Sequence, residues 1–498
     1  LSSFRTWVWA IALLGIVTAG FMPFAFDPGI ANFEVQPFIF FITGTLLGVL
    51  FLGEFHRMNI QKKLKHPQRV HAERRTRYSK AVEHLAYPNP AVRASAISTL
   101  AGLVDEWLVD EQLSVEARQK EGQVIVNALC AYVRSPFARA FKAEAFESDA
   151  PPANYAGDFA TDLAAFRGEQ DVRRSIFVEM SKRSSTLAEN EKGEVAVVPG
   201  AWSGFEFDFS RAVVFYPLDG LTIENADFSA ARFCNGSDFS GGAFVSDVNF
   251  TRAVFDQDAR FSDVTFMGTA DFSNARFAGD AFFRWVTFNA NADFHEASFG
   301  GHADFRDTTF AADAGFSGAS FEGNAEFFRS SFGGNASFFR TDFAGIAEFR
   351  EAVFEGHAGF NAATFYGDAH FSRATFEGLA GFRDVTFKAG AEFYGASFVQ
   401  TADFCDVSFV ESPPLFAAKN VESGEVYRAR FAALSAGSES AGQEAHNFAV
   451  YEDSQPIPLG TAGLNGVGYR IPVGAVLFDP ASWDERQKEY TYLSEPAQ

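Results

Sequence analysis

The chain has 498 residues, room for about three or four domains, and a formal net charge of −22 at pH 7. This acidity disfavours nucleic acid and an anionic membrane surface as partners of most of the chain. Its three cysteines, Cys130, Cys234 and Cys405, lie far apart and match no metal-binding or redox spacing, which is typical of a reducing compartment.

Two uncharged apolar stretches lie near the N-terminus. Residues 7–26 and 37–53 contain no charged side chain, and each is close to the roughly 20 residues that a membrane-spanning helix needs. We therefore predict that region 1–55 holds two transmembrane helices, over about 7–26 and 37–54. A cleaved signal peptide is the alternative for the first stretch.

A basic segment, residues 56–77, follows the second stretch and contains one acid, Glu73. The link between the stretches carries Asp27 and Glu34 and no basic residue. The positive-inside rule then places the link outside and everything after residue 55 in the cytoplasm. The basic residues nearest the membrane are candidates for contact with anionic lipid: Arg57, Lys62, Lys63, Lys65 and Arg69.

Residues 78–187 have the periodicity of α-helices. An apolar stripe at helical spacing runs from Ala91 to Leu103 after Pro88-Asn89-Pro90, and further helices are predicted over about Val115–Val133 and Asp171–Leu187. Prolines followed by such a stripe resemble one repeat of the HEAT or armadillo type, which implies a small helical stack with a docking groove for a protein. Residues 188–201 are polar and contain glycine, and we interpret them as a linker.

Phenylalanine recurs at alternating intervals of five and six residues over most of 202–410. A small residue precedes nearly every Phe by two positions, so both side chains lie on the same side of an extended segment. Fixed-period repetition is typical of a solenoid. Recurrent glycine and the strand preference of Phe argue against a helical supercoil of the same eleven-residue period. The pattern predicts coils of about 22 residues around a Phe-filled core, which includes Phe261, Phe266, Phe272, Phe277, Phe283, Phe288, Phe294, Phe299, Phe305, Phe310, Phe316 and Phe321.

Several five-residue units, such as Ala270-Asp271-Phe272-Ser273-Asn274 and Ala303-Asp304-Phe305-Arg306-Asp307, resemble the pentapeptide-repeat family. The resemblance implies a mainly β fold, a right-handed β-helix with Phe and the preceding small residue inside. Alternate units carry a sixth residue, so the cross-section, a square or a flatter rectangle, stays open. We expect the extra residue at corners where glycine adopts positive φ, at Gly268, Gly279, Gly301, Gly323, Gly334 and Gly345. Aromatic residues from Trp202 to Phe215 are expected to form an irregular first coil that closes the end of the rod.

The Phe rhythm stops at Pro413-Pro414, and residues 411–498 are predicted to cap the last coil or to lie along one face. The order of two spans, helices, β-helix and a tail containing Phe478-Asp479-Pro480 and Trp483 resembles membrane-anchored pentapeptide-repeat proteins of actinobacteria. This resemblance implies a multi-pass protein of a bacterial plasma membrane, with its N-terminus and its C-terminal domains in the cytoplasm.

No motif for catalysis, metal binding or cofactor binding is present with the required spacing. His295, Glu296 and His302 come nearest to a metal site, and their positions relative to the inward Phe residues predict outward faces. A filled solenoid also predicts no cavity for a small molecule. We therefore expect a protein that is not an enzyme and that has no cofactor.

Two hypotheses for function follow from residues 201–410, which hold 29 Asp and Glu against 13 Lys and Arg, a formal charge of −16. The first is a non-catalytic, membrane-anchored cytoplasmic scaffold that presents a rigid acidic rod to an unknown protein partner. The alternative follows from the resemblance to soluble pentapeptide-repeat proteins that imitate DNA and bind type II topoisomerases such as gyrase. A signal-transmitting sensor is a third possibility that only the predicted topology favours.

The DNA-mimic hypothesis requires continuous lines of carboxylates along the rod. Stacking positions 22 apart gives one interrupted line, Asp271, Asp293, Gly315, Ser337, Gly359, Gly381 and Asp403. It gives a more continuous line at Asp304, Glu326, Glu348, His370 and Glu392.

Overall fold

The computed structural model describes residues 13, 48, 51, 53–58, 69–189, 195–419, 424–433, 446–450, 457–486 and 489–498. The chain divides into two units, Leu1–Lys80 and Ala81–Gln498. In the first unit, residues 53–58 and 69–80 are helical, and Arg57 and Arg69 are exposed. The described residues include only a few positions of the two predicted spans. Lys62, Lys63 and Lys65 also lie outside the described residues. Within the described part of the chain, no helix combines the length and the apolar composition that a bilayer crossing needs.

The second unit begins with helices that start at recognisable caps. α3 (Pro90–Leu108) has Pro90 in its first turn and Asn89 as N-cap, and α4 (Val115–Arg134) is capped by Ser114. A short 3₁₀ segment, η1 (Ala138–Phe146), leads to α5 (Phe159–Ser181). α5 begins well before the predicted Asp171 because the Asp158 side chain accepts a hydrogen bond from the Thr161 N–H.

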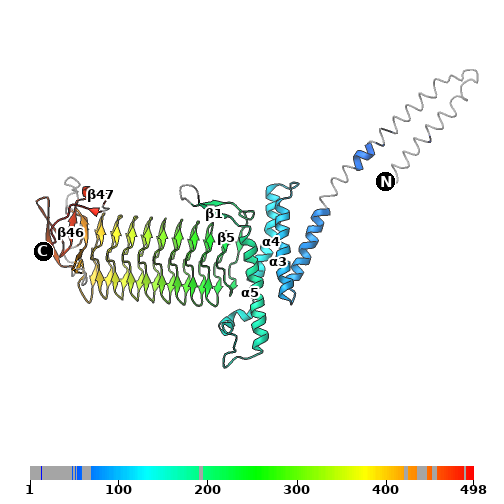
Figure 1. Ribbon diagram of the computed structural model, residues 1–498, viewed down its shortest axis with the longest axis horizontal. Helices are drawn as coiled ribbons and strands as arrows, with labels where there is room; N and C mark the ends of the chain where they lie inside the picture. The colour runs from blue at the N-terminus through cyan, green and yellow to red at the C-terminus, as the bar shows by residue number, and fades with distance from the viewer. Residues whose placement is uncertain are drawn as a thin grey trace, which may run out of the picture. The chain divides into compact units, whose positions relative to one another are not determined.

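Four parallel sheets form the solenoid that follows (Figure 1). One coil comprises β14 (Ala270–Asp271), β15 (Arg276–Phe277), β16 (Ala281–Phe282) and β17 (Thr287–Phe288). β18 (Ala292–Asp293) then pairs in parallel with β14, with Ala270 opposite Ala292, so each coil advances by the predicted 22 residues. We call the sheets that contain β14, β15, β16 and β17 faces I, II, III and IV.

The four faces differ in length because the two ends of the solenoid are built differently. Face I runs from β3 (Phe207–Asp208) to β43 (Phe448–Ala449), and face II from β4 (Val213–Val214) to β39 (Ser408–Phe409). Face III runs from β8 (Ser237–Asp238) to β36 (Ala391–Glu392), and face IV from β5 (Thr222–Ile223) to β46 (Val476–Phe478). The tail therefore adds strands to faces I and IV, and Leu415 continues face III by a parallel bridge to Glu392, so the tail does more than cover the last coil.

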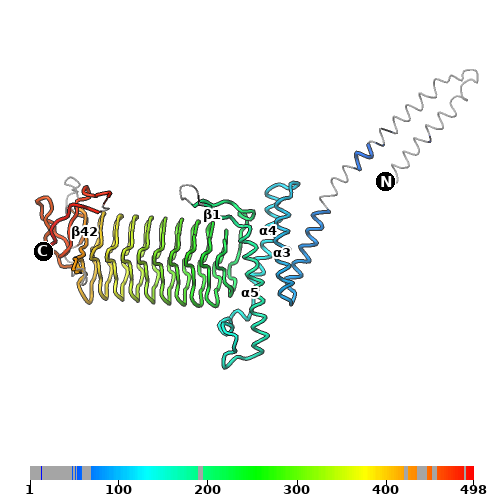
Figure 2. Tube along the Cα trace, viewed as in Figure 1, coloured from blue at the N-terminus to red at the C-terminus, as the bar shows by residue number. Residues whose placement is uncertain are grey.

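Phenylalanine side chains fill the axis in four columns. Rings in one column lie face to face, with centroids 4.9 Å apart for Phe272 and Phe294, because successive coils rise by the strand spacing. Rings in different columns meet edge to face, as Phe272 does with Phe283 at 5.6 Å and 88°. All the Phe residues predicted for the core, from Phe261 to Phe321, are buried. The tube trace in Figure 2 shows how closely the coils repeat.

Two kinds of corner alternate around each coil. After faces I and III the chain makes a β-turn, in which Ala275 N–H donates to the Phe272 carbonyl at 2.9 Å and Asn274 has φ of 59°. After faces II and IV it bends at the glycines that the sequence singled out. The prediction that these glycines adopt positive φ is wrong, because none of the six does so. Positive φ falls instead on the turn residues, which include Asp263, Asn274, Trp285, Glu296, Asp307, Gly318, Arg329, Arg340 and Glu351.

Glycine is needed at these bends because successive coils come into close contact there. A Cβ on Gly323 would lie 2.4 Å from the carbonyl oxygen of Gly301, and one on Gly345 would lie 2.5 Å from that of Gly323. Both neighbours are backbone atoms held by the ladder, so they cannot move aside as a flexible side chain would.

We expect Gly345→Ala to lower the free energy of unfolding by about 1–3 kcal/mol, because the added methyl group overpacks the bend. The matched control is Gly359→Ala, where the nearest atom to an added Cβ is the Ala336 oxygen at 3.9 Å. Urea unfolding followed by circular dichroism measures both. Equal effects of the two substitutions would contradict the close-contact explanation.

A helix covers the N-terminal end of the solenoid, in addition to the buried aromatic residues from Trp202 to Phe215 that were expected there. Phe177 of α5 packs on Phe209 with ring centroids 4.6 Å apart, while Phe207 and Asp208 already form β3 of face I. Phe166 of α5 packs on Phe215 at 5.1 Å. Figure 1 shows α5 across this end of the strands. The helical segment therefore uses apolar side chains of α5 to cap the rod.

The predicted linker is also partly structured. β1 (Thr186–Glu189) and β2 (Val195–Val198) pair antiparallel, with Thr186 opposite Val198. Ser185, just before β1, donates from its hydroxyl to Glu224 at 2.8 Å, which fastens the pair to the first coils.

Candidate interaction surface

The more continuous carboxylate line lies on face III, where Asp304, Glu326 and Glu348 are in register. Its charge is largely neutralised by neighbouring cations. Arg306 contacts Asp304 at 2.6 Å and Glu326 at 3.0 Å, and Arg350 contacts Glu348 at 2.6 Å. On face I the register confirms the interruptions at Gly315, Gly359 and Gly381. Neither face presents the uninterrupted free carboxylates that imitation of DNA requires.

The same line ends in a pair that responds to pH. His370 Nδ1 lies 2.8 Å from Glu392 Oε2, and this hydrogen bond raises the pKa of His370 above its ordinary 6.5 and lowers the pKa of Glu392. The stabilisation from His370 is complete below pH 6.5 and is lost as the pH rises through the raised pKa. That from Glu392 is present above pH 4.5 and is lost as the pH falls through the lowered pKa.

We therefore expect the chain to lose about 1 kcal/mol of stability or less between pH 6 and pH 9 because of this partly exposed pair. In His370→Gln this share of the loss disappears. Urea unfolding of both chains across the pH range measures the difference, and an identical pH slope in the variant would show that the pair contributes nothing.

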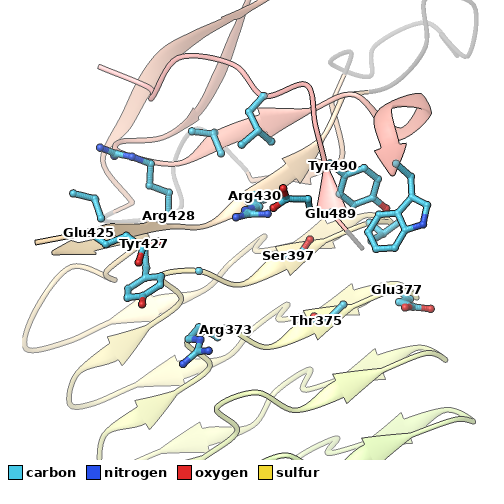
Figure 3. Close-up of a pocket in the computed structure, with 16 residues that line it drawn as sticks. Arg373, Thr375, Glu377, Ser397, Glu425, Tyr427, Arg428, Arg430, Glu489 and Tyr490 are labelled. Atoms are coloured by element: carbon cyan, nitrogen blue, oxygen red, sulfur yellow. The ribbon is translucent and has the colours of Figure 1, made fainter. Parts of the chain in front are cut away.

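Two hollows meet along the edge between faces III and IV. The larger, of about 1000 Å³, has Thr375, Ser397 and Arg430 on its floor and Trp483 and Tyr490 of the tail on one wall. Figure 3 shows Tyr427 on the opposite side from Tyr490, with Arg430 between them. The smaller hollow, of about 570 Å³, is lined by face III and its corner: Glu326, Phe328, Glu348, Arg350 and Tyr394.

Arg373 and Tyr427 line both hollows. We call the two hollows together the edge trough. It was not expected from the sequence, which predicted a filled solenoid without a binding cavity.

Most charged groups of the edge trough are already held by neighbours. Arg373 contacts Glu351 at 2.8 Å and lies over the Tyr427 ring, and Arg428 donates to the Gly474 carbonyl at 2.9 Å. Arg430 differs, because its half-buried side chain forms no hydrogen bond or ion pair with any residue that the structure describes.

The aromatic wall is built from stacked rings. Tyr490 stacks on Phe478 with centroids 4.0 Å apart, and Trp483 meets the Tyr490 ring at 5.0 Å. Burial, together with the negative charge of Glu377, raises the pKa of Tyr490. The phenol therefore stays neutral and available as a hydrogen-bond donor at physiological pH.

Sequence reasoning missed the edge trough because its parts are brought together only when the tail joins face IV. β42 (Arg430–Ala432) pairs with β37 (Ser397–Phe398), and Phe431 stacks on Phe398 at 4.9 Å. One signal was present, since Ala429-Arg430-Phe431 repeats the motif of Ala275-Arg276-Phe277. This further copy of the repeat motif, beyond residue 410, could have predicted that Arg430 lies in a strand of the solenoid.

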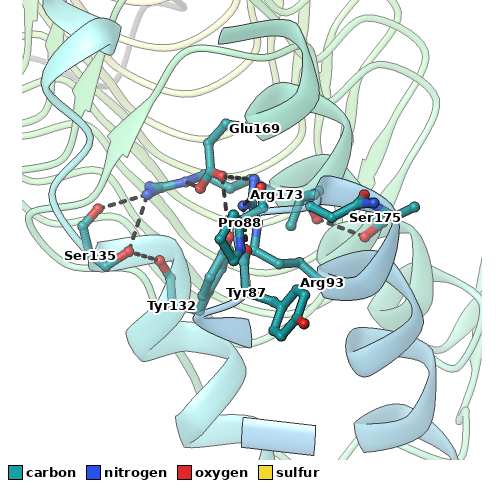
Figure 4. Close-up of polar contacts among 11 residues, drawn as sticks. Tyr87, Pro88, Arg93, Tyr132, Ser135, Glu169, Arg173 and Ser175 are labelled. Atoms are coloured by element: carbon teal, nitrogen blue, oxygen red, sulfur yellow. Dashed lines mark hydrogen bonds and ion pairs between the residues drawn. The ribbon is translucent and has the colours of Figure 1, made fainter. Parts of the chain in front are cut away.

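A second polar cluster lies buried among the helices (Figure 4). Glu169 accepts hydrogen bonds from Arg173 at 2.7 Å, Arg93 at 2.9 Å and Tyr132 at 3.2 Å. Arg173 also donates to the carbonyls of Val133 and Ser135. Burial and the charge of Glu169 raise the pKa of Tyr132 to about 12. These bonds join α3, α4 and α5, so the cluster is structural.

The residues considered for metal binding or redox chemistry have other positions. His302 Nδ1 accepts the backbone N–H of Asn324 one coil further on, and His295 and Glu296 are exposed. No group of three or more His, Cys, Asp or Glu that could hold a metal ion occurs in the ranges that the structure covers. Cys130, Cys234 and Cys405 are free and buried, and burial raises the pKa of each thiol to about 12.

Comparison with known families matches residues 242–284, 261–309 and 338–386 to the family described as Pentapeptide repeats (9 copies). All three stretches lie within the solenoid. No curated protein and no solved structure matches the chain.

Proposed function

Because the chain is a pentapeptide-repeat protein, we propose that it is a non-catalytic scaffold that holds a partner protein at the inner side of a bacterial plasma membrane. The proposal includes the right-handed sense of the coils and the two membrane spans over about 7–26 and 37–54. The absence of Lys and Arg between these stretches and the basic residues 56–77 after them support the cytoplasmic orientation.

The edge trough is the observation that carries the proposal. Tyr, Trp and Arg are the side chains that most often dominate the energetics of protein interfaces. The trough gathers Tyr427, Tyr490, Trp483 and Arg430 around a floor of hydroxyl groups. Trp483 is 44% exposed, so a large apolar ring is available to a partner at little cost in rearrangement.

The rod supports this role mechanically. Its core is a continuous stack of buried Phe rings, and every coil is hydrogen-bonded to the next, so the trough is held on a stiff support. Phe177 and Phe166 of α5 pack on the first coils, so the helices add to this support at the N-terminal end. The neutralised carboxylates of face III give the DNA-mimic alternative no support.

Site-specific photo-crosslinking in cells tests the proposal. A photoreactive phenylalanine is placed at Trp483, and at Phe339 as the control, because these rings are exposed to a similar extent, 44% and 43%. We expect a discrete adduct with one protein from position 483 and none from position 339. No adduct at 483, or the same adducts at both positions, would remove the basis for a partner at the trough.

The membrane part of the proposal has a separate measurement. We expect the chain to stay in the membrane fraction after extraction with alkaline carbonate, and residues 202–410 to resist protease added outside intact cells. Release by carbonate, or cleavage from outside, would contradict the proposed anchor or its orientation.

A further inference from the structure

The chemistry of the larger hollow identifies what kind of partner surface it accepts. We infer that the partner inserts an extended segment with a carboxylate that binds Arg430, flanked by basic side chains that face Glu377 and Glu489. This inference rests on the proposed function, because it specifies the partner of the same site.

Arg430 occupies a row of face IV that elsewhere carries mainly hydroxyl side chains. Its neighbours in register are Ser397 and Val476, and the row continues through Thr375, Val353, Ser331, Thr309, Thr287 and Thr265. The Arg430 guanidinium is half-buried in this otherwise uncharged row and forms no ion pair with a described residue. Such a group gains most from a carboxylate, which it binds through two parallel hydrogen bonds.

The rim of the hollow has the opposite charge. Glu377 and Glu489 line it and are exposed, and neither carboxylate forms a hydrogen bond or ion pair with a residue that the structure describes. Figure 3 shows Glu489 beside Arg430 and Glu377 beyond Thr375. A segment that carries only acids would be repelled by this rim. A carboxylate with a basic neighbour matches both the floor and the rim.

The length of the edge trough favours an extended polypeptide. Its lining residues Arg306, Phe328, Arg350, Ser372 and Tyr394 repeat at one position in successive coils. Four steps of the strand spacing make about 19 Å, and an extended chain covers this distance with about six residues. Aromatic contacts for such a segment come from Phe328, Tyr394 and Tyr427 in the smaller hollow and from Tyr427 and Trp483 in the larger one.

The probe is a phage-displayed library of random linear dodecapeptides, selected on the purified full-length chain in nanodiscs. Enriched peptides are then synthesised, labelled and titrated by fluorescence polarisation. We expect enriched sequences to combine an acidic residue with Lys or Arg nearby. Each peptide is measured with a free and with an amidated C-terminus, which shows whether the carboxylate comes from a side chain or from a chain end.

Arg430→Gln is expected to weaken binding about tenfold or more, and Arg430→Lys to restore part of it. The matched control is Arg340→Gln, because Arg340 is an exposed arginine at another corner of the rod. Glu489→Lys should also weaken binding, since it reverses the charge of the rim. Melting curves of all variants confirm that the fold is kept, because Arg430 points outward from β42.

Three outcomes overturn the inference. These are a selection that enriches no peptide, an enriched family without an acidic group, and peptides that bind Arg430→Gln as tightly as the unaltered chain. The proposed function is judged separately by the adduct at position 483, which forms with a folded partner even where no short peptide binds.

Discussion

Phe338→Ala is expected to lower the free energy of unfolding by about 3–5 kcal/mol, the cost of removing a fully buried aromatic ring. Phe338 stands in one Phe column between Phe316 and Phe360, with ring centroids at 5.0 and 4.8 Å. It also meets Phe327 and Phe349 edge to face. The cavity cannot be filled from above or below, because both neighbours are fixed by the strand ladder.

The adjacent residue gives a matched control. Phe339 points outward and is 43% exposed, so Phe339→Ala should change stability by less than about 1 kcal/mol. Urea unfolding monitored by circular dichroism compares the two variants in the same chain. If both substitutions cost the same, the Phe columns are not the source of the solenoid's stability.

Arg173→Ala is also expected to cost about 3–5 kcal/mol, because it leaves the carboxylate of Glu169 buried without its closest cation. Arg173 is 1% exposed and Glu169 is 6% exposed. The same guanidinium lies over the Phe215 ring, at the junction between the helices and the first coils. Its loss should therefore weaken both the helical layer and the cap of the rod.

Arg167→Ala is the control for charge alone. Arg167 pairs with Asp149 on the surface of the same helical layer, at 2.6 Å with both side chains mostly exposed. Its loss should cost less than about 1 kcal/mol. Thermal unfolding of the two variants measures the difference. A small effect of Arg173→Ala would show that Arg93 and Tyr132 suffice to hold Glu169.

The positions of charged residues illustrate where sequence patterns stop being informative. Stacking residues 22 apart placed Asp304, Glu326 and Glu348 in one line, and the register agrees. The pattern did not show that Arg306 and Arg350, two positions further along the chain, turn back onto that line. The net charge of −16 for residues 201–410 already counts these two arginines, but a sum over the sequence does not show on which face they neutralise carboxylates.

The sequence alone was sufficient for the coil length, the inward Phe residues and the parallel β-solenoid, because a coil pairs only with the coils one period before and after it. In such a fold the periodicity of the chain is the spacing of the structure. It was not sufficient for the reason behind the corner glycines, the capping by α5 or the edge trough. Each of these depends on atoms distant in sequence that meet by packing: one backbone over another at Gly323, Phe177 on Phe209, and Arg430 of the tail beside Ser397. Contacts of that kind leave no period in the chain, so only the folded molecule reveals them.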